Sequence, residues 1–145
     1  MDVHDLKFAD NTFDKVVAYE VLEHLRSPMK ALEEMKRVLK EDGEIEISIP
    51  NVWYWRLLLR AWLGLHFKRY RGLAHENESD HKQMFDVYTF EGLCKQVGLT
   101  IKEIKWLDWY GEQKMRKLSV FEPLVRLFLP KHIKYTHLMF HLRKT

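Results

Sequence analysis

Paired cysteines, a leader sequence and a long apolar run are all missing from this chain. Its single cysteine, Cys94, cannot form an internal disulfide, and we expect it to be a small buried apolar residue. Residues 1–5 are acidic and polar, whereas a secretory signal needs a basic segment followed by an apolar one. The longest apolar stretch, residues 53–67, is too short to cross a bilayer and is interrupted by Arg56 and Arg60. We therefore expect a cytoplasmic protein without a membrane span.

Charge is spread unevenly along the 145 residues, of which 46% are apolar and 31% charged. This composition is typical of one folded domain and excludes disorder. Residues 1–50 hold seven Lys/Arg against twelve Asp/Glu, and residues 112–145 hold eight against two. A polyanionic partner would therefore meet the C-terminal end, and peripheral contact with a membrane surface is one such case. A solvated basic face explains the same charge more simply, and we do not expect nucleic acid as a partner.

The stretch from Phe13 to Leu25 organises the rest of the chain. Its apolar run, residues 16–19, predicts a strand that is covered on both faces, as parallel strands usually are. Polar residues follow at once, and ligands of α/β sheets bind beyond the carboxyl ends of the strands. We expect a functional site there. The alternative is that these polar residues form the solvated first turn of a helix.

A strand-helix-strand unit is predicted next. Ser27 can cap a helix over residues 29–39, Pro28 suits its first position, and Gly43 suits a left-handed end. Alternating isoleucines then predict a strand over residues 44–50. Such a unit belongs to an α/β sheet with a right-handed crossover.

The second half of the chain gives further predicted elements. Residues 53–67 are apolar almost all round, which indicates a buried helix or a lid over a lipophilic ligand ahead of a membrane-surface helix. The remaining predictions are a polar loop over 68–82, a helix over 89–96 capped by Thr89 and closed by Gly98, a strand over 100–106, a helix over 118–129 interrupted at Pro123, and a last strand over 137–142.

Four segments together carry a family resemblance. They read DVHDLKFADNTFD (2–14), YEVLEHL (19–25), RVLKEDG (37–43) and IPN (49–51). The set resembles the second half of a class I S-adenosylmethionine-dependent methyltransferase of the type-11 group. The resemblance runs from residue 2 to residue 106.

The resemblance implies a partial Rossmann-like sheet, with strands 4 to 7 of the family, the last one antiparallel, and the first three strands missing. Residues 1–145 would then be a single truncated methyltransferase domain. Residues 52–82 would be a helical lid and loop insertion, and residues 112–136 a basic helical insertion before the last strand.

The resemblance also implies where S-adenosylmethionine would bind. The carboxylate of Asp2 would accept a hydrogen bond from the exocyclic amine of adenine, and the backbone amide of Val3 would face a ring nitrogen. Tyr19, at the end of the central strand, would contact the methionine part through its backbone. The alternative is that Asp2 is only a solvated terminal residue.

A metal site is implied by a second likeness. Glu20, Glu23, His24 and His81 resemble the metal-binding set of the small-RNA 2′-O-methyltransferases and of some ubiquinone-pathway O-methyltransferases. Two carboxylates and two imidazoles suit Mg²⁺, Mn²⁺ or Zn²⁺, and the ion would acidify an acceptor hydroxyl. Without a metal, His24 could act alone as the general base. The alternative is that Glu23 and His24 only cap and solvate a helix start.

The chain departs from the family in one important respect. The glycine-rich loop that cradles the cofactor, and the acidic residue that holds its ribose, have no counterpart in the 145 residues. The strand over 15–19 would then present an open apolar edge, which invites self-association or pairing with a partner chain. A fragment, a split enzyme and a decayed copy are the competing explanations.

The predicted function is methyl transfer to oxygen or carbon of a small-molecule acceptor, with no activity in the isolated chain. The apolar 53–67 segment would suit a lipophilic acceptor, although core packing explains the same residues. Two alternatives stand beside it: a non-catalytic half-domain that binds a partner or a membrane, and metal-assisted 2′-O-methylation of RNA.

Overall fold

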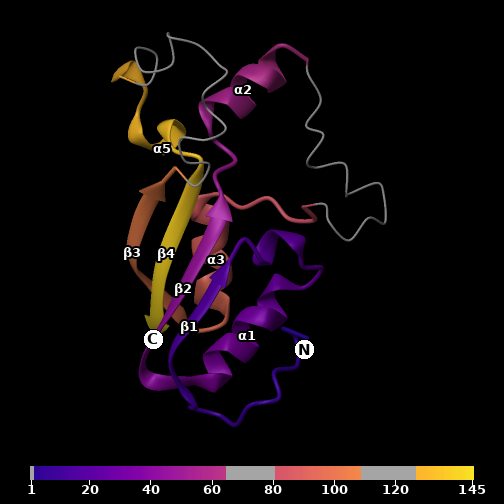
Figure 1. Ribbon diagram of the computed structural model, residues 1–145, viewed down its shortest axis with the longest axis vertical. Coiled ribbons are helices and arrows are strands. Elements are labelled where there is room, and N and C mark those ends of the chain that lie inside the picture. The colour runs from indigo at the N-terminus through magenta and orange to yellow at the C-terminus, as the bar shows by residue number, and fades with distance from the viewer. Residues whose placement is uncertain (1, 65–80, 109–126) are drawn as a thin grey trace.

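The computed structural model describes residues 2–64, 81–108 and 127–145 (Figure 1). Within these ranges the chain forms strands, helices and one 3-10 turn. In chain order they are β1 (Phe13–Tyr19), the turn η1 (Leu22–His24), α1 (Pro28–Val38), β2 (Leu39–Pro50), α2 (Trp55–Trp62), α3 (Val87–Gln96), β3 (Leu99–Leu107), α5 (Lys131–Lys134) and β4 (His137–Lys144).

The strands make a four-stranded sheet in the order β1-β2-β4-β3. β1 and β2 are parallel, with α1 as their crossover, and β4 runs antiparallel to both of its neighbours. The carboxyl ends of β1, β2 and β3 therefore meet at one edge of the sheet, the upper edge in Figure 1. The predicted α/β class, the strand-helix-strand unit and the antiparallel last strand are confirmed.

One face of the sheet carries the core. α1 and α3 pack on this face, where they cover alternate residues of the strands (Figure 1). The rings of Phe90 on α3 and Phe140 on β4 lie 4.4 Å apart between centroids and are fully buried. Cys94 is buried here as predicted, and burial raises the pKa of its thiol to about 12.

β1 is not buried on both faces, so that prediction was wrong. Ala18 faces the core, but Val17 and Tyr19 are 49% and 40% exposed on the other face. The reason is that α1 and α3 cover only one side of the sheet, and β1 is an edge strand within the described residues.

The junction between α1 and β2 also differs from the prediction. α1 ends at Val38 and β2 begins at Leu39, so Gly43 lies inside a strand and not in a left-handed helix end. A Cβ on Gly43 would come within 2.7 Å of the Leu39 side chain and 3.0 Å of the Asp14 carbonyl oxygen. The glycine therefore serves a close approach between β1 and β2 at an irregularity in their register. Ser27 makes no side-chain capping bond, although Pro28 occupies the first turn as expected.

The helices of the second half differ in extent. α2 is shorter than predicted, and none of its side chains that the structure describes is buried, so the expectation of a buried helix was wrong. α3 is capped by Asp86, and Thr89 completes a capping box at the third position instead of capping the helix itself. Gly98 does adopt the predicted left-handed conformation. The loop 68–82 and the helix 118–129 lie mostly outside the described residues.

None of the helices in the described ranges is long and apolar enough to span a membrane.

Candidate functional site

Polar side chains gather where β1 and β2 end. The backbone of Glu20 takes a positive φ of 54°, and its amide donates to the Ser48 carbonyl, which extends the pairing of the two strands by one residue. The turn redirects the chain away from the strand axis and sets the Glu20 carboxylate over the ends of the strands.

The Glu20 carboxylate binds residues of the neighbouring strands. Ser48 Oγ donates to Glu20 Oε1 at 3.1 Å, and His137 Nε2 lies 3.1 Å from Glu20 Oε2. Burial raises the pKa of Glu20, but the hydrogen bonds and charge of His137 and the bond from Ser48 outweigh it, so the pKa lies below its ordinary value. Glu20 is therefore a carboxylate at neutral pH.

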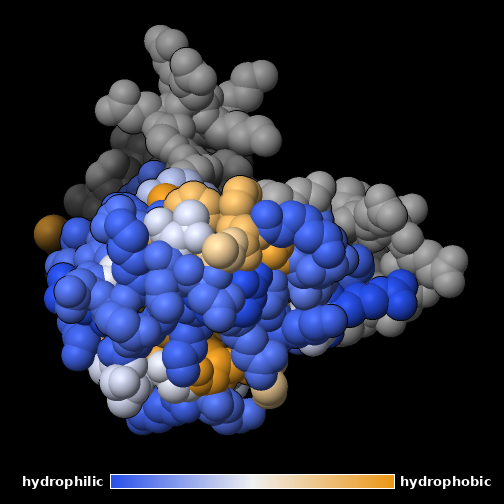
Figure 2. Space-filling model, turned by 90° about the horizontal axis from the view of Figure 1, so that it is seen from below, coloured by the Kyte–Doolittle hydropathy of each residue, from blue (hydrophilic) through white to orange (hydrophobic). Residues whose placement is uncertain are grey.

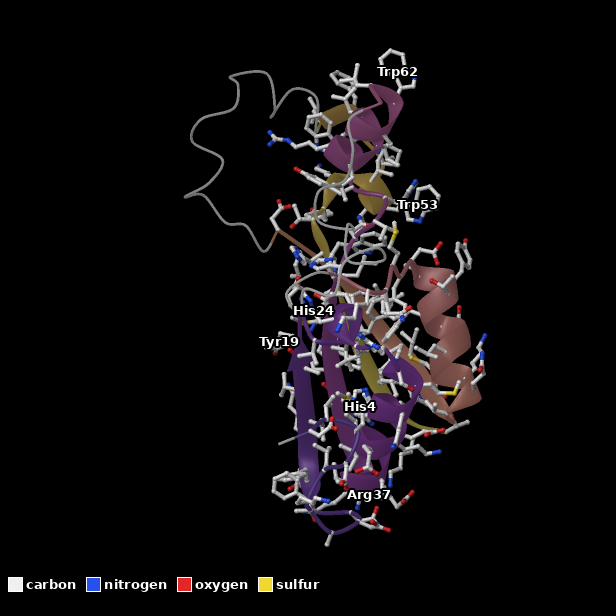
Figure 3. All side chains as sticks on the ribbon, turned by 90° about the vertical axis from the view of Figure 1, so that its right-hand side faces the viewer. His4, Tyr19, His24, Arg37, Trp53 and Trp62 are labelled. Carbon is white, nitrogen blue, oxygen red and sulfur yellow. The ribbon has the colours of Figure 1, made fainter. Side chains whose placement is uncertain are left out.

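A second group forms around η1. Glu23, His24 and His81 each place a potential ligand atom within 4.8 Å of those of the other two. Glu23 Oε1 lies 3.8 Å from His24 Nε2, and the rings of His24 and His81 meet edge to face at 4.7 Å. Glu23 and His81 are buried, whereas His24, near the end of β1 in Figure 3, is half-buried and is the most exposed of the three.

Backbone bonds explain how His81 reaches η1 from a distant part of the sequence. The amides of Lys82 and Gln83 both donate to the Glu23 carbonyl oxygen, at 2.6 and 2.9 Å. The neighbouring Leu22 is fully buried and anchors the turn in the core. This group thus rests on the rigid part of the fold.

The structure brings together three of the four predicted metal ligands. Glu20 is outside the group whose ligand atoms lie within 4.8 Å of one another, and its carboxylate is bound to His137 and Ser48, although the nearby His81 helps to lower its pKa. Glu20, Glu23 and His24 would share one face if the segment were helical, but residues 22–24 make a 3-10 turn and Glu20 precedes it with positive φ. One carboxylate and two imidazoles remain a donor set that fits a divalent cation.

The predicted cofactor-binding residues lie in two different places, the N-terminal loop and the end of β1. Asp2 is exposed, and its Oδ1 accepts from the His4 amide at 2.9 Å and lies 2.8 Å from His4 Nδ1. The backbone bond and then the side-chain bond from His4 lower the pKa of Asp2. Val3 lines a groove of about 390 Å³ along the free edge of β1. Tyr19 ends β1 there, and its hydroxyl donates to Glu46 (Figure 3).

His137 is the functional residue that the sequence did not reveal. It is fully buried, and its Nδ1 lies 2.8 Å from Thr136 Oγ1 while its Nε2 faces Glu20. The pairing of Pro50 with His137 in the antiparallel ladder brings it beside the strand ends. Only the register of β2 against β4 could have revealed this contact.

A second carboxylate-histidine group lies on the open face of the sheet. His141 Nδ1 is 2.8 Å from Glu44 Oε1 and 3.9 Å from Glu46 Oε2. Lys15 and Tyr19 both donate to the carboxylate of Glu46. Because Lys15 already balances charge here, this group is a cross-strand network of the sheet rather than a second candidate site.

Comparison with known proteins points to one family. Residues 1–47 match the family model described as a methyltransferase domain. Over 43 residues the chain is 49% identical to an uncharacterized methyltransferase of Schizosaccharomyces pombe, an alignment that covers 30% of this chain and 16% of that protein. Over 65 residues it is 43% identical to a demethylmenaquinone methyltransferase of Paenarthrobacter aurescens, covering 43% and 26%.

The fold extends this likeness to the whole chain. A methyltransferase of Haloferax volcanii, solved in complex with the Trm112 methyltransferase activator, superimposes with a TM-score of 0.66 at 16% identity and covers 99% of this chain. The chain has the class I methyltransferase fold, and its first 47 residues match the methyltransferase-domain family model. A 1,6-didemethyltoxoflavin-N1-methyltransferase of Burkholderia thailandensis, solved with its substrate and S-adenosylhomocysteine, shares the methyltransferase fold with a TM-score of 0.58 at 13% identity, over all of this chain.

The chain spans only part of the proteins that it resembles. The structural alignments cover 59% of the Haloferax chain and 49% of the Burkholderia chain. The family's glycine-rich cofactor loop has no counterpart in this sequence, whose six glycines include no G-x-G motif.

Proposed function

We propose that this chain contributes the acceptor-side half of a methyltransferase site, in which S-adenosylmethionine donates its methyl group to a small acceptor. One observation carries the proposal. The segment that matches the family model, residues 1–47, contributes Glu20, Glu23 and His24 to the polar groups at the carboxyl ends of β1 and β2. In open α/β sheets this edge is where ligands bind.

The cofactor would lie along the free edge of β1. Asp2 and Val3 would face the adenine, and the Tyr19 backbone the methionine part, as the family resemblance implies. The groove beside Val3 supports this placement because it runs along β1 from Phe13 and continues to Val21. Transfer is a direct displacement at the methyl carbon, so the chain needs to position its ligands and to supply at most one base.

Glu23, His24 and His81 would serve the acceptor. His24 is half-buried, the most exposed of the three, and would take the proton of an acceptor hydroxyl. The same three residues would hold a divalent cation, which when bound would polarise the acceptor oxygen. Glu20, held by His137 and Ser48, would act as a fixed negative charge beside them.

The isolated chain would not complete this site. It offers no glycine-rich loop for the cofactor, and the backbone edge of β1 has no partner strand within the described residues. A partner polypeptide that supplies both would pair with β1, and a second copy of this chain could occupy the same edge.

Cofactor binding by variants tests the function. In a protein extended in frame by the coding sequence upstream of residue 1, Asp2→Ala should weaken S-adenosylmethionine binding by about tenfold in calorimetry, the order of one lost charged hydrogen bond. Asp5→Asn is the matched control, because Asp5 is an exposed carboxylate of the same loop, paired with Lys7. Equal affinities of Asp2→Ala and Asp5→Asn would argue against the adenine assignment.

Metal binding can be tested separately by titration with Mn²⁺. Glu23→Gln and His81→Ala should each lower the affinity at least about tenfold, whereas Glu20→Gln should change it little. Glu33→Gln on the exposed side of α1 is the matched control. If the wild type binds no Mn²⁺, His24 remains as a base without a metal.

A further inference from the structure

The end of the molecule beyond the carboxyl edge of the sheet exposes a helix with an apolar stripe. Two pairs of apolar residues lie one turn apart on α2 and its C-terminal end: Leu58 with Trp62, and Leu59 with Leu63. All four are exposed. Trp62 is 81% exposed and points away from the rest of the molecule (Figure 3). An apolar stripe of this size on a protein surface marks a site that something else covers.

A second apolar turn lies at the same end. Leu127 and Phe128 precede α5, and Phe128 is 82% exposed. Figures 1 and 3 both place α5 and α2 beyond the carboxyl edge of the sheet, while Figure 2 views the molecule from the opposite end. The surface described at that opposite end is mostly hydrophilic, with smaller apolar patches (Figure 2). The large exposed apolar side chains of α2 and of residues 127–128 therefore share one end of the molecule.

The two segments that carry these apolar side chains have formal charge of one sign, although Asp86 of the neighbouring helix cap lies beside Trp53. Residues 51–64 and 127–136 contain no Asp or Glu, and their four basic residues are Arg56, Arg60, Lys131 and Lys134. The Arg56 guanidinium carbon lies 5.3 Å from the ring centroid of Trp55, which keeps a cation at the base of α2. Lys131 is exposed and follows the second apolar turn directly.

The combination of apolar side chains and cations indicates which kind of partner covers this surface. A second copy of this chain would bring like charges together and is disfavoured. A helix that presents leucine and tryptophan between basic residues is suited to the boundary between lipid headgroups and acyl chains, where tryptophan is favoured and cations meet anionic headgroups. We propose that α2 and the 127–134 segment dock this protein on an anionic phospholipid bilayer.

Lipid docking is a property of this surface alone and does not depend on the proposed methyl transfer. If the proposed function also holds, the carboxyl edge of the sheet would face the membrane, and the acceptor could be a lipophilic molecule drawn from it. The two proposals fail separately, because vesicle binding is measured without cofactor.

Sedimentation of the 145-residue chain with vesicles tests the proposal. The wild type should bind phosphatidylcholine vesicles that contain about one third phosphatidylglycerol, and bind pure phosphatidylcholine far more weakly. Trp62→Glu should reduce the binding about tenfold or more, because it places a carboxylate where the ring would enter the interface. Lys131→Ala with Lys134→Ala should reduce it about fivefold for each charge removed.

Phe8→Glu is the control, because Phe8 is an exposed apolar residue that precedes the start of β1 and so lies at the edge of the sheet opposite to the carboxyl ends of the strands. It should bind like the wild type, and circular dichroism should show that both glutamate variants are folded. The proposal is overturned if the wild type does not bind anionic vesicles, or if Trp62→Glu binds as well as Phe8→Glu does. A dimer in light scattering that Trp62→Glu dissociates, without vesicle binding, would also overturn it by assigning the surface to a second copy.

Discussion

The two faces of the sheet are built on different physical terms. The face under α1 and α3 is a close-packed apolar core, with Ile45, Ile47 and Ile49 of β2 fully buried. The opposite face of the same strand carries Ser48 and the carboxylates of Glu44 and Glu46, which pair with His141 and Lys15. On β2, one face is therefore stabilised by apolar burial and the other by paired charges. A substitution on one face can change one of these contributions without the other.

The largest effect should come from the core face. Ile47→Ala removes buried methyl groups from a site that cannot close around the cavity, and should lower the free energy of unfolding by about 2–5 kcal/mol. Val17→Ala on the open face is the matched control and should cost less than about 1 kcal/mol. Urea unfolding followed by circular dichroism measures both. Equal losses would mean that both faces are covered alike in solution.

A smaller loss is expected where the two strands approach each other. Gly43→Ala places a Cβ 2.7 Å from the Leu39 side chain and 3.0 Å from the Asp14 carbonyl oxygen. Because the backbone oxygen cannot move freely, the change should cost about 1–3 kcal/mol. Gly92→Ala is the matched control, since nothing lies within 4 Å of a Cβ there and alanine favours the helix. A stable Gly43→Ala variant would contradict the close approach.

The smallest effect should come from the paired charges, and it should depend on pH. Hydrogen bonds from Lys15 and then Tyr19 lower the pKa of Glu46 below its ordinary value of 4.5. A lowered folded pKa gives stability that is present above the unfolded pKa and is lost as pH falls through the folded value.

Glu46→Gln should therefore cost about 1 kcal/mol at pH 7 and flatten the loss of stability below pH 4.5. Glu103→Gln, an exposed glutamate of β3, is the control. A variant as acid-sensitive as the wild type would show that this network does not act on stability.

The sequence predicted the elements of the sheet but not how they are covered. The apolar run over 16–19 and the alternating isoleucines of 44–50 located β1 and β2, because local patterning fixes strand positions. The same run wrongly suggested burial on both faces, since apolar residues at an edge strand look like those of a central one. Burial, one of the alternatives predicted for residues 53–67, failed for a related reason: an apolar helix has the same composition whether it packs inside or outside.

The site shows the same limit. Glu23 and His24 were recognised because they adjoin β1 in the sequence, and His81 because of a family likeness. His137 was missed since its contact with Glu20 depends on the register of β4 against β2, which no local pattern encodes. Glu20 was grouped with the metal ligands because of the same family likeness, and sequence alone did not reveal that the chain makes a turn with positive φ at this residue.

Binding of S-adenosylmethionine is the measurement that tests the central claim most directly. Calorimetry should compare the 145-residue chain with the same chain extended by the upstream coding sequence. We expect binding by the extended protein and weak or no binding by the chain alone. The chain alone offers no glycine-rich loop for the cofactor, and β1 has no partner strand at its outer edge within the described residues. Sub-micromolar binding by the chain alone would contradict the half-site, and absence of binding in both forms would contradict the methyltransferase function.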